Sequence, residues 1–421
     1  GQHRSACGTR PLHSDNDAGQ GRLMNGVYKL RNTIKHYEWG SAAYIPELLG
    51  IENGAGRPYA EMWMGTHPGG QSFAVSDAGE EPLSRVSGEL PFLFKLLAAE
   101  KPLSIQAHPD KAQAEAGYAD ENARRIPLDA PERSYKDPNH KPEIICALTP
   151  FHALCGFRPP DGIKRRLSLF SCPAIKKLLR PLEADADNAV ESGALKMFLN
   201  ALFELSADEQ AEILEHATKN IGNMRNEHPQ YACELELTAR LAALFPGDAS
   251  ALSPLYLNVI ALAAGEAIFV PAGVLHAYIH GAGAELMAAS DNVIRGGLTA
   301  KHIDRAGLFG IVKFASFLPA VYRLQDAAFY EYAAPSGGFS LYRIKNLGGE
   351  TGFPVKSASI LVCMKGAVRF RFKDGGVLTV RRGESVFISK AALGAFLLSG
   401  DFEAYAASQP ASGVTCAPRQ C

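Results

Sequence analysis

The sequence predicts a mainly β protein in which two related β domains carry one helical insertion. Residues 265–271 (GEAIFVP) resemble residues 383–389 (GESVFIS), and an internal repeat in two β-rich regions indicates two related barrels or sandwiches. Residues 161–246 instead place apolar side chains at helical spacing. Residues 368–373 alternate between apolar and basic side chains, which is typical of a sheet with one wet face.

The N-terminal part of the chain divides into an extension and a β region. Residues 1–23 have neither the apolar core of a signal peptide nor a strand or helix period, so we expect a disordered extension with Met24 as the start. Short apolar alternations then predict strands with a few helices. We assign residues 24–160 and 247–320 to a first, catalytic β domain, 161–246 to the helical insertion and 321–421 to a second β domain without a metal site.

The stretch LSIQAHP (103–109) is the clearest strand with a polar face. Alternation on a strand points Ser104, Gln106 and His108 to one side, while the apolar residues between them point to the other. Pro109 cannot donate to a sheet ladder, so the strand should end there. His108 is therefore expected at a strand end, where a site can open.

The helical insertion has both a core face and a start signal. Ser206 with Glu209 forms a capping box before the next apolar run. The apolar residues that recur at helical spacing before it are Leu195, Phe198, Leu199, Leu202 and Phe203.

Composition argues for a small-molecule partner. Lys plus Arg is 43 against 44 for Asp plus Glu, so no global charge favours nucleic acid or anionic lipid. The eight cysteines are scattered without a C-x-x-C pair, which favours a reducing, cytoplasmic location over a disulfide framework. Apolar runs are interrupted before they reach bilayer length, so we expect no membrane span. We also expect a monomer.

Residues 265–276 (GEAIFVPAGVLH) fit the pattern G-x5-P-x-G-x2-H, which resembles the second signature of the cupin superfamily. Gly273 permits a tight turn, Pro271 rigidifies it, and His276 begins the next strand pointing inward. In the second repeat, Gly394 stands where the first has His276. Only the first copy is therefore expected to bind a metal.

Two further stretches complete a candidate site. YKDPNHKPEII (135–145) contributes Glu143, which with Gln106, His108 and His276 offers enough ligands for a divalent metal with positions left open. Iron or manganese would fit this set as well as zinc. In residues 285–304, Arg295 precedes two glycines and Lys301 follows, and a guanidinium with a neighbouring lysine is a common way to hold a phosphate.

One more motif is the run IKHYEWGS…PYAEMWMGTHPGG, which contains both tryptophans of the chain. Together, the motifs occur in the same order as in the type I mannose-6-phosphate isomerase (phosphomannose isomerase) family, and the chain resembles that family. The likeness covers about residues 28–304. It implies two cupin-like (jelly-roll) β domains plus an α-helical domain. It also implies one Zn2+ per subunit, held by Gln106, His108, Glu143 and His276.

The resemblance further implies roles for other residues. Arg295 matches the family's catalytic arginine, and it would stabilise either the phosphate or a developing oxyanion. Three residues remain open as the catalytic base: His140, Lys141 and Glu285. The substrate-binding residues that it implies are Ser104, Tyr278, Lys301, Glu61 and Trp39. Ala300 replaces the family's usual proline, which should loosen the loop before Lys301.

The reaction implied by the resemblance interconverts mannose 6-phosphate and fructose 6-phosphate through a cis-enediol stabilised by zinc. The partner is then a phosphorylated hexose. Two alternatives from other classes remain. One is a non-haem iron cupin oxygenase, which would show a coloured or oxidisable metal. The other is a non-catalytic cupin that binds a phosphosugar.

Overall fold

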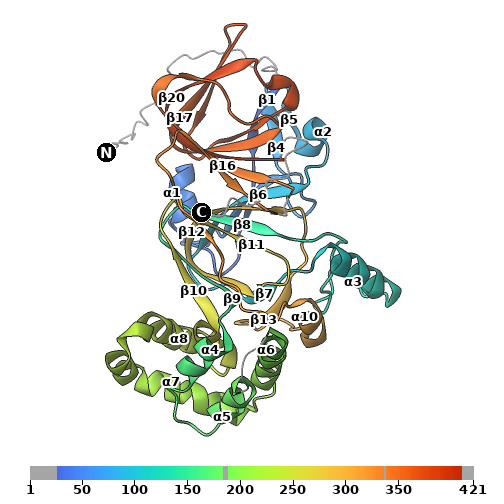
Figure 1. Cartoon of the computed structure of the whole chain (residues 1–421). Helices are drawn as coiled ribbons and strands as arrows, with labels where there is room; N and C mark the ends of the chain where they lie inside the picture. Colours follow the sequence, from blue (N-terminus) through green and yellow to red (C-terminus); the bar gives the residue numbers. More distant parts are fainter. Residues whose placement is uncertain (1–25, 184–187, 336–337, 410–421) are drawn as a thin grey trace, which may run out of the picture.

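The structure is a computed structural model that describes residues 26–183, 188–335 and 338–409. The extension expected over residues 1–23 lies outside the described residues. The fold is mainly β, with two antiparallel sheets and a helical block, as the sequence predicts. Figure 1 shows the sheet with the C-terminal strands at one end, the helical block at the other and the second sheet between them.

The sheet that contains the C-terminal strands is called here the C-terminal sheet. It has nine strands, which come from both halves of the chain. Its later strands are β15 (Phe329–Ala333), β16 (Ser340–Thr351), β17 (Ser359–Phe372), β18 (Val377–Arg381), β19 (Ser385–Ile388) and β20 (Phe396–Ser408). Its early strands are β1 (Val27–Arg31), β4 (Phe73–Ser76) and β5 (Gly79–Pro82). The sequence placed these early strands in the first β domain. They join the C-terminal sheet instead, because β1 pairs along β19 and covers an edge that would otherwise be open.

The second sheet, called the central sheet, has eleven strands. They are β2 (Thr33–Lys35), β3 (Glu61–Gly65), β6 (Phe92–Ala99), β7 (Ile105–Ala107), β8 (Glu143–Ala147), β9 (Phe151–Phe157), β10 (Leu257–Leu262), β11 (Ala267–Val270), β12 (His276–Ala288), β13 (Ile294–Gly297) and β14 (Val321–Tyr322). The first half of β12 pairs with β7 and β9, and its second half pairs with β6 and β8. A register shift between Tyr278 and His280 separates the halves.

Strand β12 is buried on both faces, and its two halves have different neighbours. Ala277 and Ile279 pack in the core of the helical block, whereas Leu286 packs in a core shared with the C-terminal sheet. An extra residue in one strand reverses the alternation of faces beyond it. The side chains that β12 presents to the interior of the central sheet are therefore His276, Tyr278, Glu285 and Met287.

The helical block covers the far side of the central sheet (Figure 1). Its helices are α4 (Pro160–Leu167), α5 (Ile175–Leu179), α6 (Asn188–Phe203), α7 (Ala207–Glu227), α8 (Ala232–Leu244) and α9 (Ser253–Tyr256), with 3-10 turns η1 (Arg180–Leu182), η2 (Pro229–Tyr231) and η3 (Ala249–Leu252). The predicted capping box is confirmed: Glu209 N–H donates to Ser206 Oγ, and Ser206 N–H donates to the Glu209 carboxylate.

The remaining helical segments lie outside that block. They are α1 (Tyr44–Leu49), α2 (Leu83–Ser87), α3 (Lys111–Ala123), α10 (Arg305–Ile311) and the 3-10 turn η4 (Lys390–Ala392). Among the helices that the structure describes, none combines the length and the apolar character needed to cross a lipid bilayer.

The internal repeat corresponds to β11 and β19, each introduced by the same kind of glycine turn. Gly265 has φ +88° and Gly383 has φ +84°, a left-handed conformation that glycine adopts without strain. The copies diverge after the repeated strand. His276 begins β12 directly, whereas its counterpart Gly394 lies in the connection between η4 and β20.

Candidate active site

Three strands of the central sheet bring the predicted metal ligands together. His276, at the start of β12, pairs with Gln106 on β7, and Glu143 is the first residue of β8. The predicted alternation in β7 is confirmed, because Ile105 and Ala107 are buried against the helical block while Gln106 faces the other way, into the interior. The strand ends before His108.

His108, Glu143 and His276 form a compact group of possible metal ligands. The ligand atoms of all three lie within 4.8 Å of one another, and each side chain is about 1% exposed. His108 Nε2 is 3.2 Å from one carboxylate oxygen of Glu143, and His276 Nε2 is 3.3 Å from the other. It is the one such group found among the described residues. Two imidazoles and a carboxylate match the donor chemistry of a catalytic zinc site with an open position.

Backbone carbonyls fix both imidazoles in the form that a metal requires. His108 Nδ1 lies 2.7 Å from the carbonyl oxygen of Asn292, and His276 Nδ1 lies 3.0 Å from that of Val274. A carbonyl oxygen only accepts, so each Nδ1 carries the proton and donates it. Each Nε2 is therefore left with its lone pair facing Glu143.

Glu143 is held as a carboxylate by its surroundings. Lys141 Nζ donates to Glu143 Oε1 at 2.5 Å, and the Tyr278 hydroxyl donates to Oε2 at 3.3 Å. Burial would raise the pKa of Glu143, but the groups around it, Lys141 foremost, outweigh burial and hold this pKa well below its ordinary value. The negative charge that a cation needs is thus present near neutral pH.

Gln106 lies beside this group. Its amide nitrogen is 3.4 Å from His276 Nε2. The two ends of an amide have nearly the same shape, so a half-turn of the group would direct its oxygen to the same place. The fourth ligand implied by the family resemblance is therefore within reach of the other three.

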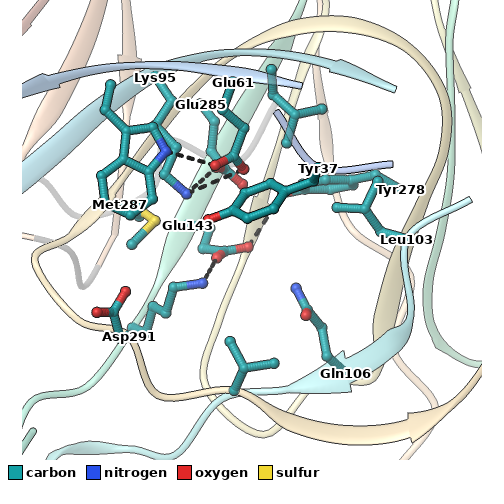
Figure 2. A pocket seen from close by; sticks show the side chains of 14 residues that line it. Tyr37, Glu61, Lys95, Leu103, Gln106, Glu143, Tyr278, Glu285, Met287 and Asp291 are labelled. Carbon is teal, nitrogen blue, oxygen red and sulfur yellow. Dashed lines mark hydrogen bonds and ion pairs between the residues drawn. The ribbon is translucent and has the colours of Figure 1, made fainter. Parts of the chain in front are cut away.

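Gln106 and Glu143 line an open cavity of about 160 Å³, and His108 and His276 both contact Glu143. Figure 2 shows Gln106, Glu143, Tyr278 and Glu285 directed towards the cavity. Glu61 and Lys141 also line it. Six of the predicted site residues therefore meet in one place.

A buried charge cluster forms the opposite wall of the cavity. Lys95 Nζ lies 3.2 Å from Glu285 Oε2 and 3.6 Å from Glu61 Oε1, and the Trp63 indole N–H donates to Glu61 at 2.6 Å (Figure 2). Burial alone would lower the pKa of Lys95, but the two carboxylates outweigh it and raise that pKa. Lys95 therefore stays charged in the interior.

Arg295 lies next to this cavity with no counter-charge of its own. It pairs with Gln106 across β13 and β7, so its side chain shares the face of Gln106, and Val293, two residues earlier, lines the cavity. Within the described residues, the Arg295 guanidinium makes no ion pair or side-chain hydrogen bond. Burial lowers its pKa. A half-buried, unpaired guanidinium is suited to an anionic group of a ligand.

Besides the two histidine ligands and Arg295, four predicted residues do not line the cavity. Ser104 is half-buried just before β7, and His140 is half-buried beside the cavity-lining Lys141. Trp39 stacks on the cavity residue Tyr37, with ring centroids 5.7 Å apart. Lys301 is exposed on the loop after β13.

Sequence reasoning missed several cavity residues: Tyr37, Trp63, Lys95 and Asp291. The signal for Lys95 was present, because it is a lone cation in the apolar run PFLFKLL. A charge in a strand buried on both faces has to be paired. The wall formed with Glu61 and Glu285 could have been inferred from that rule.

The metal-free protein is expected to lose stability as the pH falls from about 6.5 to about 4. Burial, followed by the charge of Lys141, lowers the pKa of His108 to about 4. Between that value and the ordinary value of about 6.5, the unfolded chain binds more protons than the folded one, so the free energy of unfolding falls with the pH. Urea unfolding of the metal-free native chain and of His108→Gln at about pH 7 and about pH 5 tests this. An equal loss in both proteins would contradict it.

Comparisons with known proteins point to one family. The sequence model of "Phosphomannose isomerase type I, catalytic domain" matches residues 27–160. Mannose-6-phosphate isomerase of Escherichia coli (strain K12) is 38% identical over 389 residues, which cover 86% of this chain and 95% of that protein. The Homo sapiens mannose-6-phosphate isomerase is 32% identical over 416 residues, with 86% and 94% covered.

Solved structures agree with these relatives. A variant of phosphomannose isomerase from Salmonella typhimurium matches with a TM-score of 0.81 at 34% identity, covering 91% of this chain and 99% of that one. A zinc-bound mannose 6-phosphate isomerase matches with a TM-score of 0.80 at 34% identity, with the same coverage. Fold, sequence and the His–Glu–His group all lead to the same conclusion: the chain belongs to the type I mannose-6-phosphate isomerase family.

Proposed function

We propose that this chain is a zinc-dependent aldose–ketose isomerase that interconverts mannose 6-phosphate and fructose 6-phosphate. The observation that carries the proposal is the group His108, Glu143 and His276, which meets at a cavity lined by further carboxylate and ammonium groups. These three residues, with Gln106, would hold one zinc ion per subunit. When bound there, zinc supplies polarisation of the substrate carbonyl and its neighbouring hydroxyl.

The residues around the cavity are assigned to proton transfer and to orientation of the metal ligands. Isomerisation requires a group that removes a proton from the carbon beside the carbonyl and returns it to the adjacent carbon. Lys141 and Glu285 line the cavity, whereas His140 does not. Because the Lys141 ammonium group donates to Glu143, we assign proton removal and return to the Glu285 carboxylate and proton donation to Lys141. Burial raises the pKa of Glu285, and the ion pair with Lys95 opposes that rise. The hydroxyl of Tyr278 orients Glu143.

Arg295 is assigned to an anionic group of the substrate. Its guanidinium is half-buried and lacks a carboxylate partner within the described residues, so the phosphate or a developing oxyanion would be its first counter-charge. Glu61 is assigned to the wall that contacts the sugar. Three predicted substrate-binding residues do not line the cavity: Ser104, Trp39 and Lys301. They could bind the substrate only where it extends beyond the cavity.

The chain is further proposed to act as a monomer in the cytoplasm. The described cysteines are free thiols, and Cys146, Cys155, Cys172 and Cys363 are buried, which suits a reducing compartment. The oligomeric state is measured directly by sedimentation.

The test is a coupled assay that follows fructose 6-phosphate formed from mannose 6-phosphate. Turnover should disappear on prolonged chelation and return on addition of about one equivalent of zinc. Folded, zinc-loaded protein that does not turn over mannose 6-phosphate would overturn the isomerase. Oxygen consumption with bound iron would then identify an oxygenase, and binding of the phosphosugar without turnover would identify a non-catalytic cupin.

A further inference from the structure

We propose that Asp248, at the end of the helical block, is a positioning residue that sets the direction of Arg295. The inference rests on the proposed function, in which Arg295 meets an anionic group of the substrate. Asp248 itself touches no residue of the cavity wall. It acts through the backbone of the strand that carries Arg295.

Asp248 and Ser250 hold one peptide group, the backbone N–H of Leu298, and this pair of hydrogen bonds is called the clamp. The backbone N–H of Leu298 donates to Asp248 Oδ2 at 3.0 Å and to Ser250 Oγ at 2.7 Å. The other carboxylate oxygen of Asp248 accepts from the backbone N–H of Ser250 at 2.8 Å. Both acceptors come from the segment that enters and forms η3, while Leu298 directly follows β13.

The clamped residue is in a conformation that it would not adopt alone. Leu298 has φ +51°, and within the described residues only Arg125 is another non-glycine residue with positive φ. A side chain with a Cβ atom is strained in this region, so surrounding contacts have to impose it. Leu298 is also 2% exposed and packs in the core of the helical block. Hydrogen bonds and burial together therefore hold the strained turn.

The strain lies next to a bulge that directs Arg295. The pairing of β13 with β7 shifts register between Arg295 and Gly297, and bulges beside active sites re-aim side chains. A Cβ atom placed on Gly297 would lie 2.3 Å from Ser250 Cβ, so the strand runs in direct contact with η3. The bulge, the strained residue and the clamp thus occupy consecutive positions after Arg295.

Two features make Arg295 sensitive to this clamp. Its guanidinium has no ion pair or side-chain hydrogen bond within the part of the chain that the structure describes, so no polar contact of its own fixes where it lies. A cavity of about 310 Å³ also borders Asp248, Gly296, Gly297 and Thr299, and a released loop would have space to relax into it.

The helical block is tied to the same clamp. Gln210 on α7 accepts the backbone N–H of Ala249 at 3.0 Å, so α7 fixes the segment that holds Asp248. The insertion would therefore contribute to the reaction without placing a side chain in the cavity.

The experiment is a double-mutant cycle between Asp248→Asn and Arg295→Ala, read by the coupled isomerase assay. Asp248→Asn keeps the shape but leaves one acceptor oxygen for two N–H groups, so we expect kcat/KM to fall by about 10-fold to 100-fold. If Arg295→Ala acts mainly on kcat, Asp248→Asn should also act mainly on kcat, and if Arg295→Ala acts mainly on KM, Asp248→Asn should do the same. In the Arg295→Ala background, Asp248→Asn should change kcat/KM by less than about 2-fold.

Ser171→Ala provides the matched control, because it removes a side-chain hydrogen bond to His216 in the helical block and contacts neither β13 nor Gln210. It should change kcat/KM by less than about 2-fold. If Asp248→Asn does not fold, Ser250→Ala removes one of the two acceptors of Leu298 N–H and is tested in the same cycle.

The outcomes separate this inference from the proposed function. Additive losses in the cycle, or an unchanged kcat/KM in Asp248→Asn, would overturn the positioning role while native turnover still supports the isomerase. Absence of native turnover would overturn the isomerase and this inference with it.

Discussion

The His276→Ala variant is expected to lose its bound zinc and to isomerise mannose 6-phosphate about a thousandfold more slowly than the native chain. His276 provides one of three ligand atoms that lie within 4.8 Å of one another, and its ring is fixed through Nδ1 on the Val274 carbonyl. Its loss leaves an incomplete ligand set. Metal content of the purified protein and the coupled assay measure both effects.

His280→Ala is the matched control for this variant. His280 lies on the same strand, four residues later, but beyond the register shift, and it does not line the cavity. It should keep the native zinc content and activity. Full zinc occupancy and native turnover in His276→Ala would remove His276 from the ligand set.

Lys95→Met is expected to lower the free energy of unfolding by about 3–5 kcal/mol, because it removes the cation from a buried cluster and leaves two carboxylates unpaired. Methionine has nearly the length of the lysine stem, so packing is largely retained. The side chains of Lys95, Glu61 and Glu285 are all less than 10% exposed, with values of 8%, 7% and 4%. Urea unfolding measures the loss.

The loss in Lys95→Met should also depend on pH in a defined direction. Burial already raises the pKa of Glu285 and the charge of Lys95 opposes this rise, so removing the ammonium group raises that pKa further above its value in the unfolded chain. The folded variant then binds more protons than the unfolded chain, so its free energy of unfolding falls as the pH rises.

Lys35→Met is the control, because the Lys35 ammonium group lies 4.4 Å from the centre of the Trp63 ring but is partly exposed. This change should lower the free energy of unfolding by less than about 1 kcal/mol. Equal losses in the two variants, or no dependence on pH, would contradict the buried cluster.

Much of the site could be predicted because its motifs are local. Alternation in LSIQAHP correctly placed Gln106 opposite Ile105 and Ala107, and the Pro–Gly turn before His276 correctly predicted a new strand at that residue. The capping box at Ser206 was equally local. In each case, a few neighbouring residues contain the physical reason for the structure.

Other features depend on distant partners and could not be read from a local pattern. Glu285 faces the same interior as His276 although the two differ by an odd number of positions, because the register shift between Tyr278 and His280 reverses the alternation. Nothing in the residues of β12 alone fixes that shift. The placement of β1, β4 and β5 in the C-terminal sheet is of the same kind, since β1 would pair with any open edge of suitable register.

The pairing of β1 with β19 determines how early the C-terminal sheet can form while the chain is being translated. Lys29 and Glu384 are 355 residues apart and meet at 3.0 Å. A ribosome adds about 5–20 residues per second, so β1 waits about 20–70 s for its neighbour to be made. During that interval the edge of β1 that later pairs with β19 is open, and the C-terminal sheet can close only after β19 and β20 have been made. Long-range pairing of this kind also slows refolding in the test tube.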